Sequence, residues 1–450
     1  MTESNRTNFG SRFGVIVAMV GSAVGLGNIW RFPYMVGENG GAAFILIYLL
    51  FSFLISLPVF CAEFVIGRRG RAGAIGAFRK LAPGSKWYLG GFLSVIAVFL
   101  ILSFYSVVGG WGIKYMVDAI QLKFSAAAAT TDFGEAFAGF STGRYEPLIY
   151  MMVFVLVTAA VVVLGVQKGI ERFSKWMMPL LFVLILVLVA RSAFLPGGAS
   201  GYSYLFRPDF SKITSGTLIA ALGQSFFSMS LGMGAIIIYG SYVKRDDNIL
   251  GHSLITVSLD TVFALLAACA IMPAVFSFGV QPNQGPGLVF VTLPYIFTNM
   301  PLGNLVALFF FVSLLLAAVS SAISLVEVMV SFLIEECRCS RKLAVGISIA
   351  MQALFGTLCS LSLMPGTRLK IAGMSLFDCF DKVSSDYVLT IGALLIVLFV
   401  GWRLKRADFM DEMSSGGTVR APKWMLNTIY WIIKVVAPLA ILSILIFSRE

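Results

Sequence analysis

The chain has 450 residues, of which 58% are hydrophobic and only 12% are charged. A soluble domain of that composition would lack the polar surface that keeps it dispersed, so we expect a membrane protein with many spans. The net charge of +11 is also typical of a nucleic-acid-binding protein, but here the basic residues recur in every second loop. That spacing is the positive-inside pattern of a membrane protein with a cytoplasmic N-terminus, and we expect no nucleic-acid partner.

Apolar runs recur along the whole chain, and one span needs about 20 apolar residues, so we expect about eleven membrane helices. The first six are expected at about 12–36, 42–66, 88–117, 147–164, 170–194 and 217–243. The seventh ends near 278, and the others begin near 302, 343, 388 (or already near 377) and 424. The loop 126–145 is polar, and the proline-containing loop after 278 is long enough to hold short helices.

The first apolar segment is interrupted at residues 22–33, SAVGLGNIWRFP, which contain closely spaced glycines, Asn28 and Arg31. Unpaired backbone groups at membrane depth cost several kcal/mol each, so a break is tolerated only where something else binds them. Freed amides at a helix start can bind a carboxylate, and freed carbonyls can bind a cation. An amino acid together with Na⁺ offers both charges. Gly21 and Gly25 also form a G-x-x-x-G pattern, so close helix packing stays an alternative for this segment alone.

A second interruption lies in the sixth span, where residues 230–234 (SLGMG) repeat the small-residue pattern of residues 22–27. Paired glycine-interrupted spans in two halves indicate the binding site of an inverted-repeat transporter. We therefore expect four parts: a cytoplasmic N-terminal segment at 1–11, a first repeat of helices 1–5 at 12–194, an outer loop with a second repeat of helices 6–10 at 195–402, and a cytoplasmic linker with helix 11 at 403–450.

Four stretches, at 21–33, 38–41 (ENGG), 223–234 (GQSFFSMSLGMG) and 317–325 (AAVSSAISL), resemble the neurotransmitter:sodium symporter family. The resemblance covers almost the whole chain in order and is closest to the bacterial amino-acid transporters of eleven helices. It implies an all-α fold with a 5+5 inverted-repeat core, broken helices 1 and 6 and an eleventh helix. It also implies sodium-coupled import of hydrophobic L-amino acids, aliphatic and aromatic, by alternating access.

The resemblance further implies the substrate site. The amides of Leu26 and Gly27 and the hydroxyl of Tyr105 match the groups that bind the substrate carboxylate. The groups that match those receiving the ammonium are the backbone oxygens of Ala23, Phe227 and Ser228 and the hydroxyl of Ser230. The side-chain pocket would consist of Ile101, Phe227, Met233, Ser321 and Leu325.

Met233 stands where a small-aliphatic-selective relative carries a bulky aromatic residue. Methionine is unbranched and adaptable, which predicts a pocket that also admits aromatic side chains. Plain core filling is an equally good interpretation of Met233 from the residues alone.

Two sodium sites also follow from the resemblance, with hard oxygen ligands that suit an alkali cation. The first matches the Ala23 carbonyl, Asn28, Ser228, Asp260 and the substrate carboxylate. The second matches the carbonyls of Gly21, Val24 and Ala317 with the hydroxyls of Ser320 and Ser321. Serine pairs in membrane helices often serve packing only, and it is the AAVSS context that favours an ion site.

Asp260 departs from the asparagine that is common in the family, and Ala264 replaces the serine of chloride-dependent members. Asp260 would supply a fixed negative charge in place of chloride, while Tyr48, Gln224 and Ser228 keep parts of the chloride surroundings. We therefore expect chloride-independent transport, and a second hypothesis is that Asp260 takes up a proton when sodium leaves. The alternative is an ordinary acidic residue near a helix end.

The resemblance assigns four further roles. Glu63 would hydrogen-bond the unwound segments of helices 1 and 6. Arg31 and Asp381 would form the outer gate, with Asp378 close by as an alternative partner. The cytoplasmic gate would consist of Arg6, Glu335, Ser241, Tyr242 and Phe9. Gly169 and Pro179 match a motif that lets the inner end of helix 5 unwind, although a plain helix start and a proline kink explain them equally well.

Other function classes fit less well. A channel needs a continuous polar stripe, whereas the polar groups here are isolated at the broken helices. An enzyme is disfavoured by a single histidine and few acids within the spans. A non-transporting amino-acid sensor on the same fold stays an alternative. We expect a multi-pass protein of the bacterial cytoplasmic (inner) membrane, with the N-terminus inside and, since the span number is odd, the C-terminus outside.

Overall fold

The computed structural model describes residues 8–125, 131–280, 287–419 and 421–447. Most of these residues are helical, and strands in the described ranges are limited to an antiparallel hairpin of β1 (Lys370–Ile371) and β2 (Met374–Ser375). The expected all-α class is therefore confirmed.

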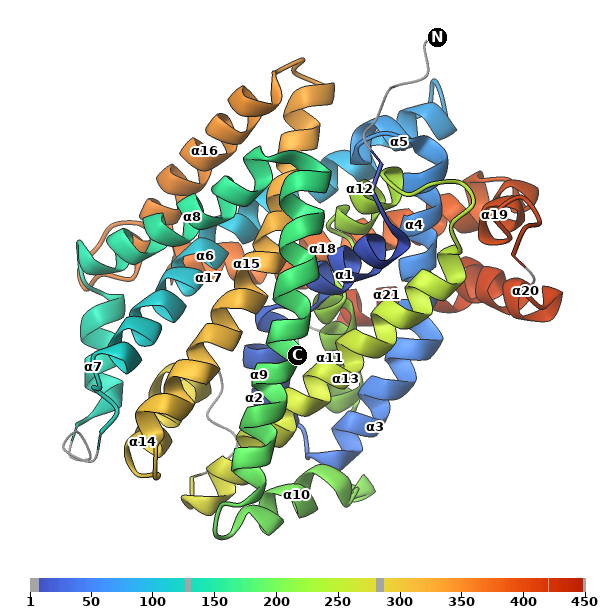
Figure 1. Cartoon of the computed structure of the whole chain (residues 1–450). Helices are drawn as coiled ribbons and strands as arrows, with labels where there is room; N and C mark the ends of the chain where they lie inside the picture. The colour runs from blue at the N-terminus through green and yellow to red at the C-terminus, as the bar shows by residue number, and fades with distance from the viewer. Residues whose placement is uncertain (1–7, 126–130, 281–286, 420, 448–450) are drawn as a thin grey trace.

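The helices form a tall bundle with short elements at both ends (Figure 1). Those before residue 195 are α1 (Arg12–Ala23), α2 (Phe32–Glu38), α3 (Ala42–Phe51), α4 (Leu57–Gly70), α5 (Ala74–Leu81), α6 (Tyr88–Ile120), α7 (Phe133–Ser141), α8 (Glu146–Val163) and α9 (Arg172–Ala193). Those after it are α10 (Gly198–Phe206), α11 (Ser215–Ser228), α12 (Ala235–Ser241), α13 (Ile249–Ser277), α14 (Leu293–Thr298), α15 (Gly303–Glu335), α16 (Arg341–Ser362), α17 (Leu376–Lys382), α18 (Leu389–Leu398), α19 (Arg406–Met413), α20 (Lys423–Trp431) and α21 (Ala437–Phe447).

Wider π-helical turns continue or precede several of these helices. They are η1 (Gly27–Arg31), η2 (Ser52–Ser56), η4 (Val166–Glu171), η6 (Leu288–Thr292), η7 (Val383–Val388), η8 (Phe399–Arg403) and η9 (Ile432–Val436), and a single 3₁₀ turn in the described ranges is η5 (Phe210–Lys212). Such turns often occur at functional sites. Two of them, η1 and η4, lie in the segments that the sequence marks as special.

In the described residues, nine helices are long and apolar enough to cross a membrane, and α1 with the segment Gly27–Glu38 forms a tenth that is bent by 49°. The remaining expected span, the sixth, is occupied by α11 and α12, which are each too short to cross alone and are separated by residues 229–234. The start of the tenth expected span at 377 rather than 388 is the better of the two alternatives, since α17, η7 and α18 run on continuously from Leu376.

Both predicted breaks are present. α1 is capped at its start by Ser11, whose hydroxyl accepts a hydrogen bond from the Gly14 amide, and it is followed by Val24, whose backbone is extended. The second break contains three residues with positive φ, Ser230 at 53°, Gly232 at 82° and Gly234 at 73°. Glycine adopts that conformation without a Cβ penalty, which explains why the helix breaks in this segment.

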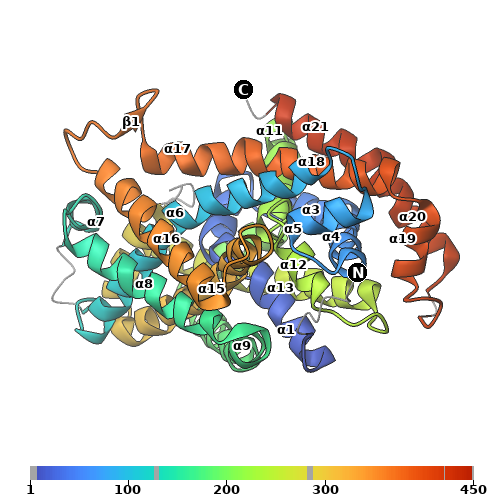
Figure 2. The ribbon, with the colours of Figure 1, turned by 90° about the horizontal axis from the view of Figure 1, so that it is seen from above.

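The two breaks lie inside the bundle, because α1 packs against α9, α12, α13 and α15. Viewed from above, α8 and α9 lie along one edge of the molecule and α20 and α21 along another (Figure 2). The short helices α7 and α10 lie within stretches expected to be loops, because single short helices leave little apolar periodicity to read. α10 covers the end of α2, where the Tyr204 hydroxyl donates to the Gly37 carbonyl at 2.9 Å.

Candidate substrate and sodium site

Three buried polar side chains meet between the first break and α13. The Asn28 amide nitrogen donates to the Asp260 carboxylate at 2.8 Å and to the Ser228 hydroxyl at 3.0 Å. The Ser228 hydroxyl donates to the other Asp260 oxygen at 2.7 Å. The structure therefore brings together the three side chains predicted for the first sodium site, although Asn28 and Asp260 are 232 positions apart.

Only neutral donors contact Asp260 in the described part of the chain, and no basic side chain there forms an ion pair with it. A carboxylate buried without an opposite charge is costly, so this cluster favours a bound cation. Asn28 also fixes the break itself, because its side-chain oxygen accepts from the Gly25 amide at 3.0 Å. Tyr48 and Gln224 surround the cluster, with the Gln224 amide donating to the Gly27 carbonyl at 2.9 Å and the Tyr48 hydroxyl 3.5 Å from Ser228 Oγ. Ala264 is buried on the same helix as Asp260.

The predicted second sodium site is also assembled from distant segments. The Ser320 hydroxyl lies 3.0 Å from the Ala317 carbonyl and 3.3 Å from the Val24 carbonyl. The Ser321 hydroxyl contacts the same Val24 carbonyl at 3.3 Å. A Cβ added at Gly21 would lie 3.5 Å from Ser320 Cβ, so α1 and α15 approach closely here. Hydroxyl and carbonyl oxygens that converge in this way suit a hard cation.

The groups predicted to bind an amino acid lie on the two breaks and on α6 beside them. The Leu26 amide lies 3.5 Å from the Tyr105 hydroxyl, which joins two of the predicted carboxylate ligands. The Ser230 hydroxyl, on the opposite break, donates to the Ser22 carbonyl at 3.1 Å beside the buried Ala23. A Cβ added at Gly27 would lie 3.1 Å from the Phe227 ring, so the second break packs directly on the first.

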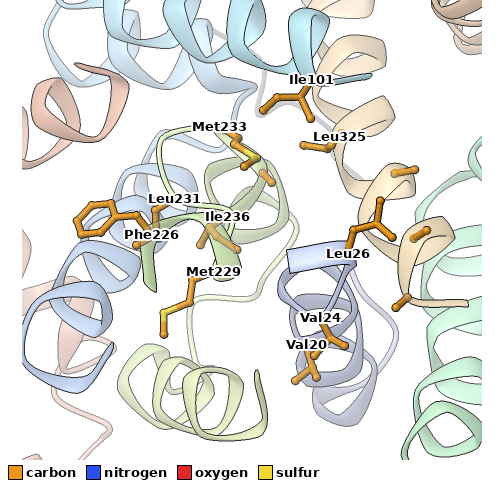
Figure 3. Packing of buried hydrophobic residues seen from close by; sticks show 14 of the residues in the cluster. Val20, Val24, Leu26, Ile101, Phe226, Met229, Leu231, Met233, Ile236 and Leu325 are labelled. Carbon is orange, nitrogen blue, oxygen red and sulfur yellow. The ribbon is translucent and has the colours of Figure 1, made fainter. Parts of the chain in front are cut away.

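An apolar surface adjoins these polar groups. Ile101 on α6, Met233 in the second break and Leu325 on α15 are 2–3% exposed and belong to one buried hydrophobic cluster (Figure 3). Ser321 lies one helical turn before Leu325, and its hydroxyl points to the Ser22 carbonyl at 3.1 Å. Freed backbone groups and an apolar wall together fit a hydrophobic amino acid.

Gly25 is expected to tolerate no side chain. A Cβ at this position would lie 2.3 Å from Ser321 Oγ and 3.3 Å from the Tyr105 hydroxyl, in the space predicted for the substrate carboxylate. We expect Gly25→Ala to lower sodium-dependent amino-acid binding by at least about 10-fold, since displacing buried polar contacts costs about 1–3 kcal/mol. Scintillation-proximity binding of labelled amino acid measures this effect, and Gly139→Ala, where the added Cβ meets nothing within 4 Å, is the control. Unchanged binding in Gly25→Ala would contradict the assignment.

Glu63 on α4 contacts one of the two breaks. Its Oε1 accepts from the Gly232 amide at 2.7 Å, which satisfies a backbone group freed by the interruption. The sequence predicts contacts to both breaks, whereas the hydrogen bond present in the described residues goes to the second.

Arg31, the last residue of η1, lies over the Phe227 ring, with the guanidinium carbon 4.4 Å from the ring centroid. Arg31 and Asp386 line a cavity of about 130 Å³ next to this ring. Arg31 and Asp381 form no ion pair within 4.0 Å, and Asp381 instead accepts from the Ser385 hydroxyl at 3.1 Å. The outer gate therefore stays a prediction.

The structure describes only part of the predicted inner gate, because Arg6 lies outside the described residues. The Phe9 amide donates to the Tyr242 carbonyl at 3.0 Å, and its ring packs edge-on against the Tyr242 ring. The Glu335 carboxylate accepts from the Gly73 amide at 2.7 Å, and the Ser241 hydroxyl donates to the Ile238 carbonyl. The contacts of Phe9 hold the segment before α1 against the end of α12.

Sequence reasoning missed a buried ion pair at this end. Glu327 on α15 is fully buried and pairs with Arg341 at 2.5 Å, while the Tyr242 hydroxyl donates to it at 2.8 Å. An acid within an apolar helix was the available signal, since such residues are rare unless functional or paired.

Glu171, the last residue of η4, is a second residue that the sequence did not reveal. Its carboxylate accepts from the Gly10 amide at 2.7 Å and the Ser11 hydroxyl at 3.0 Å, and it pairs with Lys175 at 2.6 Å. The same turn contains Gly169, where a Cβ would lie 2.1 Å from the Val161 carbonyl, and Pro179 lies within α9. Whether Gly169 and Pro179 permit unwinding stays a prediction.

Comparison with known proteins agrees with this geometry. The model of the sodium:neurotransmitter symporter family matches residues 6–136 and 142–449. The uncharacterized sodium-dependent transporter YhdH of Bacillus subtilis is 39% identical over 444 residues, which cover 99% of this chain and 98% of that protein. An uncharacterized sodium-dependent transporter of Haemophilus influenzae is 36% identical over 461 residues, covering 99% of each.

Among solved structures, the crystal structure of MhsT in complex with L-phenylalanine has a TM-score of 0.90 and 43% identity, covering 98% of this chain and 99% of that one. A likeness of that extent confirms the fold expected from the paired breaks. Family proteins are membrane transporters rather than enzymes. The chain belongs to the sodium:neurotransmitter symporter family.

Proposed function

We propose that the protein imports hydrophobic L-amino acids, aliphatic and aromatic, by coupling their movement to that of Na⁺ through two sodium sites, without a need for chloride. The N-terminus lies in the cytoplasm of the bacterial inner membrane, and the C-terminus lies outside. The binding site opens in turn to the outer side, past Arg31 and Phe227, and to the inner side, past Phe9 and Tyr242.

One observation carries the proposal. The buried cluster of Asn28, Ser228 and Asp260 lies directly beside the break that presents the Leu26 amide, with Tyr105 opposite. A cation at the cluster and a carboxylate at the break would neutralise each other, so each raises the affinity for the other. Linkage of that kind is what coupling requires. The bound L-phenylalanine named for MhsT supports an amino-acid substrate with an apolar side chain.

Accumulation in proteoliposomes tests the proposal. With purified protein in vesicles, we expect labelled leucine to accumulate when an inward sodium gradient is imposed and not when potassium replaces sodium. Sodium-dependent leucine binding without accumulation would indicate a non-transporting sensor. Leucine flux that follows only its own gradient would indicate a channel, and either result contradicts the proposal.

The apolar wall predicts a broad substrate range. Met233 can move its unbranched side chain aside, so the space beside Ile101 and Leu325 can admit an aromatic ring. We expect tryptophan and tyrosine, each at 100-fold excess, to reduce labelled leucine uptake by more than about 90%, as simple competition between ligands of similar affinity predicts. Lysine at the same excess is the control, since a buried ammonium has no partner on this wall. Absence of inhibition by both aromatic amino acids would contradict the broad range.

A further inference from the structure

A large open groove lies on the side of the bundle. It has a volume of about 670 Å³ and runs between the ends of α8 and α9, with Leu316 of α15 at its base. Its walls are apolar, and they include Leu164, Phe173, Trp176 and Leu180. Figure 2 shows α8 and α9 along one edge of the molecule.

Two basic residues, Lys168 and Arg172, lie at one end of this groove. Both side chains are exposed, and none of the ion pairs within the described residues involves either of them. Glu171 lies between them in sequence, but its carboxylate is engaged by the Gly10 amide, the Ser11 hydroxyl and Lys175. Within the part of the chain that the structure describes, the groove therefore has two positive charges without an ion-pair partner next to its apolar walls.

The surface around the groove indicates what covers it. Along α8 and α9 the outward side chains are large and apolar, and they include Leu156, Val157, Val183, Leu186 and Val187, all exposed. Such a surface is stable only in contact with lipid chains. Trp176 is 78% exposed beside the two cations, which is typical of a tryptophan at the membrane–water boundary. The cations thus lie at the level of lipid headgroups.

We propose that this groove binds one anionic phospholipid of the cytoplasmic leaflet, such as phosphatidylglycerol. The phosphate lies between the Lys168 ammonium and the Arg172 guanidinium, and an acyl chain follows the wall formed by Trp176 and Leu180. Basic pockets between membrane helices on the cytoplasmic side favour anionic headgroups. The site depends on the proposed topology but not on the transported substrate.

The position of the site has a structural consequence. Lys168 belongs to the π-helical turn η4, and Arg172 is the first residue of α9. A phosphate between Lys168 and Arg172 joins η4 to α9, so a bound lipid stabilises the helical conformation of η4.

Quenching of Trp176 fluorescence by brominated lipid tests the site without any transport measurement. The protein is reconstituted in bilayers with a minor fraction of brominated phosphatidylglycerol or brominated phosphatidylcholine. Because the chain has seven tryptophans, the contribution of Trp176 is taken as the difference between the parent and Trp176→Phe. Two free cations favour the anionic lipid by roughly 10-fold or more, so we expect quenching of Trp176 by phosphatidylglycerol to exceed that by phosphatidylcholine at least about threefold.

A double variant and a matched control decide the outcome. We expect Lys168→Ala/Arg172→Ala to remove the preference for the anionic lipid. Lys86→Ala/Arg403→Ala removes the same charge from exposed positions outside the groove. This control is expected to retain the preference for the anionic lipid. Equal quenching by both lipids in the parent, loss of the preference in both double variants, or no quenching of Trp176 by either lipid would overturn the proposal.

Discussion

Asn28→Ala is expected to abolish sodium-dependent substrate binding while leaving the protein folded. The substitution removes the donor to Asp260 and Ser228 and the acceptor for the Gly25 amide. Hydrogen bonds to charged groups contribute about 1.5–3 kcal/mol each, so losing the donor to Asp260 and the proposed sodium ligand together is expected to lower affinity by about 100-fold or more. Sodium titration of labelled leucine binding to the purified protein measures the loss.

The control for this variant is Asn299→Ala. Asn299 is exposed in the loop after α14, and its amide donates to the Tyr295 carbonyl at 2.8 Å, so the same chemical change is made away from the site. We expect parental binding in the control and similar thermal unfolding midpoints in both variants. Sodium-dependent leucine binding within about threefold of the parent in Asn28→Ala, with the protein intact, would contradict the first sodium site.

Asp260→Asn is expected to lower sodium affinity by a comparable amount. The carboxylate is the one charged group of the Asn28–Ser228–Asp260 cluster, and an opposite unit charge at about 4 Å is worth up to about 4 kcal/mol at an effective dielectric constant of 20. The variant keeps the shape of the side chain, so any loss of sodium affinity is due to the loss of the negative charge. We expect the sodium concentration for half-maximal leucine uptake to rise at least about 30-fold, which corresponds to roughly half of that energy.

Anion replacement completes this test. In the parent, leucine uptake is expected to be equal when gluconate replaces chloride, because the proposed role of Asp260 is to supply the negative charge that an exchangeable anion would otherwise bring. Asp209→Asn, a neutralised acid with a half-exposed side chain in the loop before α11, is expected to behave like the parent. A large loss of parental uptake in gluconate, or an unchanged sodium requirement in Asp260→Asn, would contradict the role of this carboxylate.

Much of the fold could be predicted from the sequence, because a bilayer imposes simple rules on composition. Continuous apolar runs predicted the long helices, and glycines at 25, 27, 232 and 234 predicted the two breaks, since backbone conformation at such points depends on local residues. Short elements such as α7 and α10 were not predicted, because they are held by contacts with other segments rather than by their own periodicity.

The individual site residues came chiefly from family resemblance, and the sequence offered no geometric route to them. Glu327 and Arg341 show the limit of this approach, because neither stood out before the ion pair was visible. The Arg31–Asp381 pair shows that resemblance can also imply a contact that is absent, since these two side chains form no ion pair within 4.0 Å in this structure.

The sequence by itself determined that this is a many-span membrane protein whose first and sixth helices are broken, because both properties depend on neighbouring residues. Only the tertiary structure decided that the Asp260 carboxylate lies 2.8 Å from Asn28 and that the Val24 carbonyl faces Ser320 and Ser321. Contacts between residues hundreds of positions apart depend on how whole helices pack, and packing is decided by the shapes of all the surfaces that meet. That Lys168 and Arg172 form no ion pair within the described residues is likewise visible only once the helices have been placed.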